Sequence, residues 1–214
     1  MRKMLNGLNI KILLVLTLLT CNKINAQVYQ IPNGNFESWS NGVPNNWNTF
    51  NTANCHLSIG CGSAQSNHHS EESGRPGSSG SKSLKIYATS ILGIVANGNI
   101  TTGRINIGSM TAADASNYNY TDRNNYNVVF NGTPDSLYVW TKFTAANSSS
   151  RARISVVLHG NTDFQDPPQL TSTSLYKGQA TKEFLPTDWV QQKIPFVFNS
   201  CCSYMGWDQR PDDG

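Results

Sequence analysis

The chain has 214 residues, of which 38% are hydrophobic and 14% are charged, and its formal net charge is +3. This length suffices for one well-buried domain, or at most two small ones. Four of the 16 Lys and Arg residues precede Gln27, which leaves 12 basic and 13 acidic residues after it, a net charge of −1. Nucleic acids and anionic membranes are bound by clustered Lys and Arg, so the composition gives no electrostatic basis for either partner.

Residues 1–26 have the features of a secretory signal peptide. Arg2, Lys3 and Lys11 flank an apolar run at 12–19, and small or polar residues precede a cut after Ala26. The apolar run is too short to span a bilayer, so we expect no transmembrane segment in the mature chain. The sequence therefore predicts a protein that is secreted, periplasmic or at the cell surface.

The number of cysteines supports this predicted localisation. Cys55, Cys61, Cys201 and Cys202 lie beyond the leader, and an even number in an oxidising compartment favours disulfides over metal ligation. Cys55 and Cys61 are the first candidate pair, because they close a short loop. Vicinal Cys201 and Cys202 rarely pair with each other, so one or both can remain as thiols.

A less favoured alternative for the localisation is a lipid anchor at Cys21, since Leu-Leu-Thr-Cys resembles a lipoprotein cleavage box apart from its Thr.

The start of the mature chain is rich in turns. Asn-Gly dipeptides and Pro44 forbid a long helix, so Phe36, Trp39 and Trp47 must lie on short extended pieces. We expect these aromatics to plug one end of a sandwich core.

A long polar segment follows at residues 54–82. It holds Cys55, Cys61 and several His residues, but their spacing fits no compact zinc pattern, so we predict no metal site. The segment is expected to be an exposed disulfide loop. Loops of this length are uncommon unless they carry function, which makes it a candidate ligand-facing rim.

Strands are predicted where apolar and polar residues alternate. The expected strands are 83–88, two short strands within 91–107, then 134–144, 151–159 and 189–198. In the first of these, Leu84, Ile86 and Ala88 are expected to point inward. Residues 111–127 and 163–186 are expected to be mostly loop, and Pro195 indicates an edge or a bulge. No 3.6-residue apolar period persists, so the sequence predicts an all-β, two-sheet antiparallel β-sandwich of jelly-roll type.

The strand at 134–144 is the centre of this scheme. Alternation places Leu137, Val139, Thr141 and Phe143 on one side and Tyr138, Trp140, Lys142 and Thr144 on the other. We predict an antiparallel hairpin with 151–159. Its outward face would then combine Tyr138, Trp140, Lys142, Arg151 and Arg153.

A glycan site is predicted on this surface. Aromatic rings stack against the apolar face of a sugar, and nearby cations bind hydroxyls or a uronate. The candidate ligand-binding residues are Trp140, Tyr138, Tyr87, Lys142 and Arg153. The alternative is that Trp140 and Tyr138 belong to the core, because a one-residue slip exchanges the two faces of a strand.

Signals for catalysis are weaker. Glycoside hydrolysis generally uses two carboxylates in one cleft, and local pattern marks out no such pair. There is no Gly-x-Ser-x-Gly elbow. Tyr138, His159 and Arg153 could imitate the Tyr, His and cation of jelly-roll polysaccharide lyases. A structural Ca²⁺ site of loop oxygens is compatible with such folds, but no Asp-rich run marks one.

Several segments together resemble a known family. They are Pro-Asn-Gly-Asn-Phe-Glu-Ser-Trp with Val-Pro-Asn-Asn-Trp, Gly-Ser-Lys-Ser-Leu-Lys-Ile, Pro-Asp-Ser-Leu-Tyr-Val-Trp-Thr-Lys-Phe, and Thr-Asp-Trp-Val-Gln-Gln-Lys-Ile-Pro-Phe. In this order they resemble the secreted bacterial carbohydrate metabolism domains, which look like carbohydrate-binding jelly rolls. The resemblance implies a sandwich of carbohydrate-binding type over residues 27–200. Such domains usually close with a strand rich in Asp and Val, so the different tail at 201–214 predicts a truncated or frame-shifted chain lacking its last strand or two.

The resulting expectation is a non-catalytic module of a Gram-negative carbohydrate-utilisation system that binds a polysaccharide or oligosaccharide. One alternative is a jelly-roll glycoside hydrolase or polysaccharide lyase. Another is a cell-surface adhesion module with a protein partner, and the sequence leaves the oligomeric state open.

Overall fold

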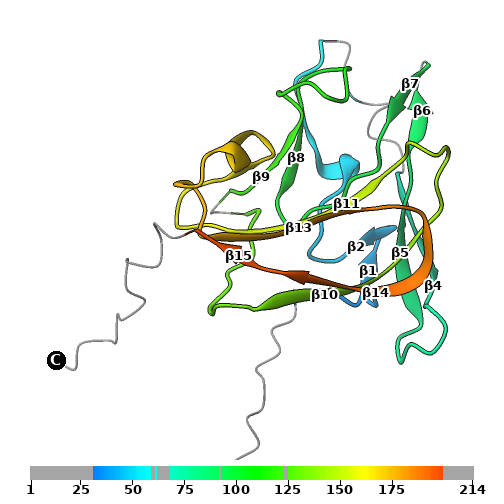
Figure 1. Cartoon of the computed structure of the whole chain (residues 1–214). Coiled ribbons are helices and arrows are strands. Elements are labelled where there is room, and N and C mark those ends of the chain that lie inside the picture. The colour runs from blue at the N-terminus through cyan, green and yellow to red at the C-terminus, as the bar shows by residue number, and fades with distance from the viewer. Residues whose placement is uncertain (1–30, 59–60, 62–67, 92, 123–124, 200–214) are drawn as a thin grey trace, which may run out of the picture. The chain divides into compact units, whose positions relative to one another are not determined.

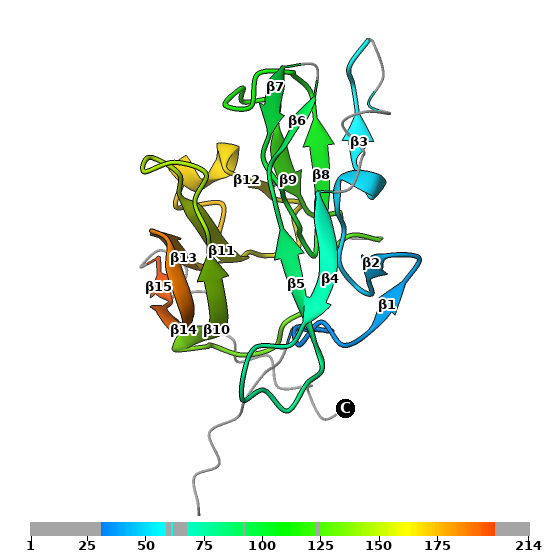
Figure 2. The same ribbon diagram turned by 90° about the vertical axis from the view of Figure 1, so that its right-hand side faces the viewer.

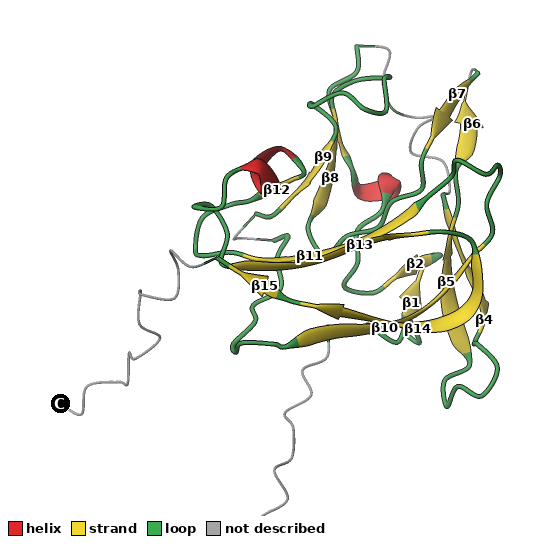
Figure 3. Ribbon diagram, viewed as in Figure 1, coloured by secondary structure: helices red, strands yellow, loops and turns green. Residues whose placement is uncertain are grey.

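The computed structural model describes residues 31–58, 61, 68–91, 93–122 and 125–199. Strands dominate this part of the chain, and the two helices in it are short 3₁₀ turns, η1 (Phe50–Thr52) and η2 (Pro168–Thr171) (Figure 3). The prediction of an all-β, sandwich-like fold with little helix is confirmed. Within these ranges no helix has the length and apolar character needed to cross a bilayer. The predicted leader, the anchor at Cys21 and the tail at 201–214 lie outside the described residues.

The strands are labelled in Figure 1, except β3 and β12, which are labelled in Figure 2. They are β1 (Trp39–Ser40), β2 (Val43–Pro44), β3 (Asn54–Cys55), β4 (His69–Ser73), β5 (Lys82–Ile86), β6 (Thr89–Ile91), β7 (Ile94–Ala96), β8 (Arg104–Ile107), β9 (Tyr118–Tyr120), β10 (Ser136–Phe143), β11 (Ala152–Leu158), β12 (Gln165–Asp166), β13 (Gly178–Phe184), β14 (Thr187–Pro195) and β15 (Val197–Phe198).

Two groups of strands face each other in the second half of the chain. Strand β10 pairs antiparallel with β14, while β11, β13 and β15 form a three-stranded antiparallel sheet. Residues 185–186 carry the chain from β13 in one group to β14 in the other (Figure 1). Phe143 and Phe184 meet edge to face between the groups, with ring centroids 6.0 Å apart. Ala180 and Ile194 are buried there, as apolar residues of a sandwich interior should be.

A second core lies in the first half of the described chain. Strands β12, β9, β8 and β3 form one sheet, in which β3 runs parallel to β8. This pairing corrects the expectation of purely antiparallel sheets. Ala53, Cys61, Ile105 and Ile107 are buried together beside it. A disulfide joins Cys55 to Cys61 across a Cα–Cα distance of 5.9 Å.

Antiparallel hairpins complete the fold. Strands β4 and β5 form one hairpin, and β6 and β7 form another (Figure 2). The aromatics of the opening segment are half-buried: the Phe36 and Trp47 ring centroids lie 5.2 Å apart, and Trp39 stacks on His69.

Four expectations about the elements were wrong. Residues 134–144 and 151–159 do not form a hairpin, because β10 pairs with β14 and β11 with β13. The segment at 54–82 is not only a loop, since it contains β3 and β4. Residues 163–186 include the seven-residue strand β13, whereas the described part of 111–127 is mostly loop, as expected, apart from the three-residue β9. Ile86 and Ala88 are exposed rather than inward.

Candidate functional site

The outer face of β10 and β14 carries exposed aromatic and polar side chains. Burial alternates along β10, leaving Tyr138 and Trp140 56% and 42% exposed while Leu137 and Val139 are more covered. Tyr138 lies opposite Lys193 and Trp140 opposite Gln191 in the antiparallel register. We call the surface formed by Tyr138, Trp140, Lys142, Gln191 and Lys193 the outer face. Trp140 and Tyr138 are therefore surface residues, and the alternative that they belong to the core is wrong.

The opposite face of the same strands is buried. Gln192 and Ile194 alternate with Gln191 and Lys193 along β14, and they are only 7% and 3% exposed. The Lys182 Nζ atom on β13 donates a hydrogen bond to Gln192 Oε1 at 2.8 Å. This contact fixes which side of β14 faces the other sheet.

An arginine from a distant loop covers one tryptophan. The Arg75 guanidinium carbon lies 3.9 Å from the ring centroid of Trp140, a close cation–π contact. Arg75 belongs to the turn between β4 and β5, where Gly77 adopts a positive φ of 74° that suits a glycine. One of its N–H groups donates to the Pro76 carbonyl at 3.1 Å.

A carboxylate anchors the end of this loop. Glu37 accepts hydrogen bonds from the Lys82 backbone N–H and the Ser81 hydroxyl, each at 2.8 Å. These bonds, the Lys82 N–H first, hold the pKa of Glu37 below its ordinary value because they stabilise the charged form. The loop that presents Arg75 is therefore tied to the opening segment of the chain.

Cations lie along the rest of the outer face. The Lys193 ammonium is 5.6 Å from the centroid of the Tyr138 ring. Lys142 forms an ion pair with Asp188 at 3.1 Å. The pKa of Asp188 is lowered, chiefly because its carboxylate accepts the Trp189 backbone N–H and secondly because of Lys142. Asp188 is thus a carboxylate at neutral pH.

A broad, open depression of about 840 Å³ adjoins the Lys142 end of the outer face. Its walls come from the end of β10 with the turn after it, and from the β13–β14 connection. The lining residues are Lys142, Phe143, Thr144, Ala145, Asn147, Ser148, Leu185, Pro186, Thr187 and Asp188. The depression gives an extended ligand room to continue beyond the aromatic residues.

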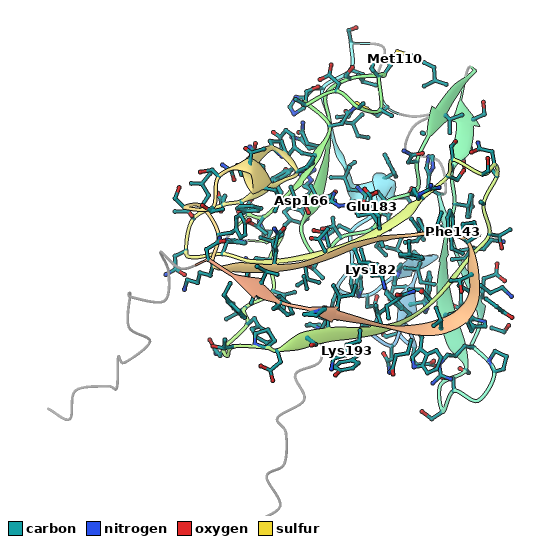
Figure 4. The ribbon with its side chains drawn as sticks, viewed as in Figure 1. Met110, Phe143, Asp166, Lys182, Glu183 and Lys193 are labelled. Carbon is teal, nitrogen blue, oxygen red and sulfur yellow. A yellow bond between two sulfur atoms is a disulfide. The ribbon has the colours of Figure 1, made fainter. Side chains whose placement is uncertain are left out.

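Arg153 lies on the far side of the sandwich from Trp140. In the antiparallel register Arg153 lies opposite Glu183. Lys182, the residue of β13 before Glu183, points inward to Gln192, so Glu183 and Arg153 point to the other side of their sheet. Figure 4 marks Lys182 between the strand groups, Lys193 beyond β14, and Asp166 with Glu183 beyond β13. Arg153 instead pairs with Asp166 at 2.9 Å. The predicted surface that combined Arg151 and Arg153 with Tyr138 and Trp140 is therefore wrong.

Tyr87 follows β5 and is half-buried. Its backbone N–H donates to the His68 carbonyl at 3.0 Å, and the Lys85 ammonium lies 6.0 Å from its ring. Of the five predicted ligand-binding residues, the structure brings together Trp140, Tyr138 and Lys142. Whether Tyr87 binds a ligand stays a prediction.

The lyase-like combination is not assembled. His159 stacks on Phe164 with ring centroids 5.4 Å apart, and its Nε2 lies 3.2 Å from Thr121 Oγ1. These contacts place it beside β9 and β12 rather than beside Tyr138 on β10. Glu37, Asp114 and Asp188 have lowered pKa values, the direction opposite to that of a general acid. Within the described ranges, no cluster of three or more His, Cys, Asp or Glu residues is arranged to hold a metal ion.

Sequence reasoning missed Arg75 and did not place Lys193 beside Tyr138. The turn around Arg75, Gly-Arg-Pro-Gly, indicates an exposed loop tip but not its neighbour. The position of Lys193 beside Tyr138 would follow from pairing β10 with the strand that begins at Thr187 instead of with the strand nearest in sequence.

Searches of protein-family models, characterised proteins and solved structures found no match to this chain.

Proposed function

We propose that this chain is a secreted, non-catalytic glycan-binding module of a bacterial carbohydrate-utilisation system, and that the outer face of β10 and β14 is its binding surface. The observation that carries the proposal is the exposure of Tyr138 and Trp140 at alternate positions of one strand. Large aromatics with a polar rim are typical of surfaces that recognise ligands, because burying their rings removes apolar area from water.

The geometry suits a linear oligosaccharide. Residues two apart on a strand are separated by about 7 Å, so one extended ligand can reach both rings. Gln191 and Lys193 lie directly across the strand pair from them and supply hydrogen-bonding groups for sugar hydroxyls. The depression beyond Lys142 continues this track.

A glycan array on the protein beginning at Gln27 tests the proposal. Trp140→Ala is expected to weaken binding about tenfold or more, because an aromatic stacking contact is worth about 1–3 kcal/mol. Phe198→Ala is the matched control, since Phe198 is 41% exposed but lies on β15 in the other sheet. Thermal melts establish that each variant is folded.

Each outcome has a distinct meaning. Binding by the parent and by Phe198→Ala, with loss in a folded Trp140→Ala, supports the proposal. A folded parent that retains no glycan, or a folded Trp140→Ala that binds as the parent does, contradicts it. Release of reducing ends or unsaturated sugars from a bound glycan would show an enzyme instead of a binding module.

A further inference from the structure

We propose that the outer face selects anionic glycans that carry uronate carboxylates, and that Arg75 is the residue that makes this selection. The inference rests on the proposed function and names the class of glycan. It starts from the observation that Arg75 already occupies a face of the exposed Trp140 ring.

The charges on this surface are not balanced. Asp188 pairs with Lys142. In the part of the chain that the structure describes, the remaining ion pairs of the neighbouring hairpin join Lys82 to Glu71 and Lys85 to Glu72, and none involves Arg75 or Lys193. The two cations over the aromatic rings therefore lack an acidic partner among these residues, which favours a ligand that brings negative charge.

Stacking leaves Arg75 able to bind a carboxylate. A guanidinium lying against an aromatic ring keeps its N–H groups in its own plane, and that planar fork matches a carboxylate with two parallel hydrogen bonds. The single donor given to the Pro76 carbonyl uses only part of this fork. Glu37 holds the far end of the loop, so the side chain is presented by a tethered loop and loses less entropy on binding.

The same contact disfavours a neutral sugar. To stack on the covered face of Trp140, a neutral ring must displace the guanidinium and lose its cation–π attraction. A uronate can keep the Arg75–Trp140 contact and add an ion pair to it. Lys193 beside Tyr138 offers a second cation for the next acidic unit of a polyuronate.

Calorimetric titration with paired polysaccharides tests this selection. Polygalacturonate and alginate are each compared with an esterified form, which keeps the backbone but removes the charge, and dextran sulfate serves as a non-uronate polyanion. We expect the parent to bind the acid forms about tenfold more tightly than the esters, since a charge-assisted hydrogen bond of this kind contributes that much. The preference should shrink as salt is raised.

Substitutions of Arg75 give the residue-level test. Arg75→Gln is expected to bring acid and ester affinities together, and Arg75→Lys to retain part of the preference. Arg151→Gln is the matched control, because Arg151 is exposed but bonds to the Ser148 and Ser150 carbonyls at the start of β11. Its preference for the acid forms should equal that of the parent.

Several results would overturn the inference without touching the proposed function. They are equal binding of acid and ester by the parent, binding of neutral glycans alone, dextran sulfate bound as well as the uronates, or a preference that survives Arg75→Gln. A parent that binds no glycan on the array contradicts the proposed function and the selection together.

Discussion

Lys182 on β13 and Gln192 on β14 are joined by a 2.8 Å hydrogen bond that links the two facing strand groups. Gln192 also donates from Nε2 to the Thr141 hydroxyl at 3.2 Å. Both ends of its amide are therefore hydrogen-bonded, as a side chain that is only 7% exposed requires. Because neighbouring residues of a strand point to opposite sides, this buried amide directs Gln191 and Lys193 outward. An interior contact thereby defines the proposed binding surface.

Breaking this bond should destabilise the protein. Lys182→Met removes the donor and leaves Gln192 Oε1 without it in the interior, which costs about 1–3 kcal/mol. Chemical denaturation measures the free energy of unfolding. Adding Gln192→Leu removes the acceptor as well, and a double-mutant cycle should show coupling between the two sites. Strictly additive effects would mean that the bond contributes nothing to stability.

Ile194 is expected to be a principal core residue of this half. It is 3% exposed, and truncation of a buried Ile to Ala usually lowers the free energy of unfolding by about 2–5 kcal/mol. Val129→Ala is the control, because Val129 is 81% exposed and its change should stay within about 0.5 kcal/mol. Equal effects of the two substitutions in urea unfolding would contradict this burial.

The alternation within β10 was predictable from the sequence. A period of two over Leu137–Phe143 is a local pattern, and the structure places its two sets of side chains on opposite faces. The partner of β10 was not predictable from it. Pairing depends on which strands meet in space, and the partner of β10 is not the strand nearest in sequence, at 151–159, but β14, which lies much further along the chain.

Polar strands were missed for a related reason. Strand β4 reads His-Ser-Glu-Glu-Ser and β13 reads Gly-Gln-Ala-Thr-Lys-Glu-Phe, so neither has a continuous apolar face. Cross-strand ion pairs such as Lys82–Glu71 support β4, and a buried Ala180 with an inward Lys182 supports β13. The contact of Arg75 with Trp140 joins a loop tip to a distant strand, so no local pattern indicates it.

The disulfide between Cys55 and Cys61 should contribute to stability. The two cysteines are separated by 6 positions in the sequence. Closing a loop of this length lowers the conformational entropy of the unfolded chain, which stabilises the folded state by about 2 kcal/mol. We expect Cys55→Ser with Cys61→Ser to lower the melting temperature, and dithiothreitol to shift the parent toward the same value. Thiol counting before and after reduction shows that the bond was present. If reduction left the melting temperature of the parent unchanged, the disulfide would have no structural role.

The Arg75–Trp140 contact is expected to matter little for folding. Cation–π contacts at exposed sites contribute about 0.5–1 kcal/mol, so Arg75→Gln and Trp140→Ala should both fold with free energies of unfolding close to that of the parent. Near-ultraviolet circular dichroism and urea unfolding measure this. A loss of several kcal/mol in either variant would show that this surface contact contributes more to stability than its exposure implies.

Acid should loosen the loop that carries Arg75. The pKa of Glu37 is depressed by its bonds to the Lys82 N–H and the Ser81 hydroxyl, so its contribution to stability is complete above the ordinary glutamate pKa range of about 4 to 5. That contribution is lost as the pH falls through the lower, folded-state pKa, because protonation weakens both hydrogen bonds. The free energy of unfolding should therefore decline as the pH falls through this range, which we call the acid limb of the stability profile.

Glu37→Gln is expected to remove this part of the pH dependence, because the amide does not titrate in the range. NMR titration of the Ser81 and Lys82 amide signals reports the transition directly, and unfolding in urea from pH 3 to 7 reports its effect on stability. Glu72→Gln is the control, since Glu72 pairs with the Lys85 side chain at 3.6 Å. A Glu37 transition at or above the ordinary glutamate range, or an acid limb unchanged in Glu37→Gln, would show that this carboxylate does not anchor the loop.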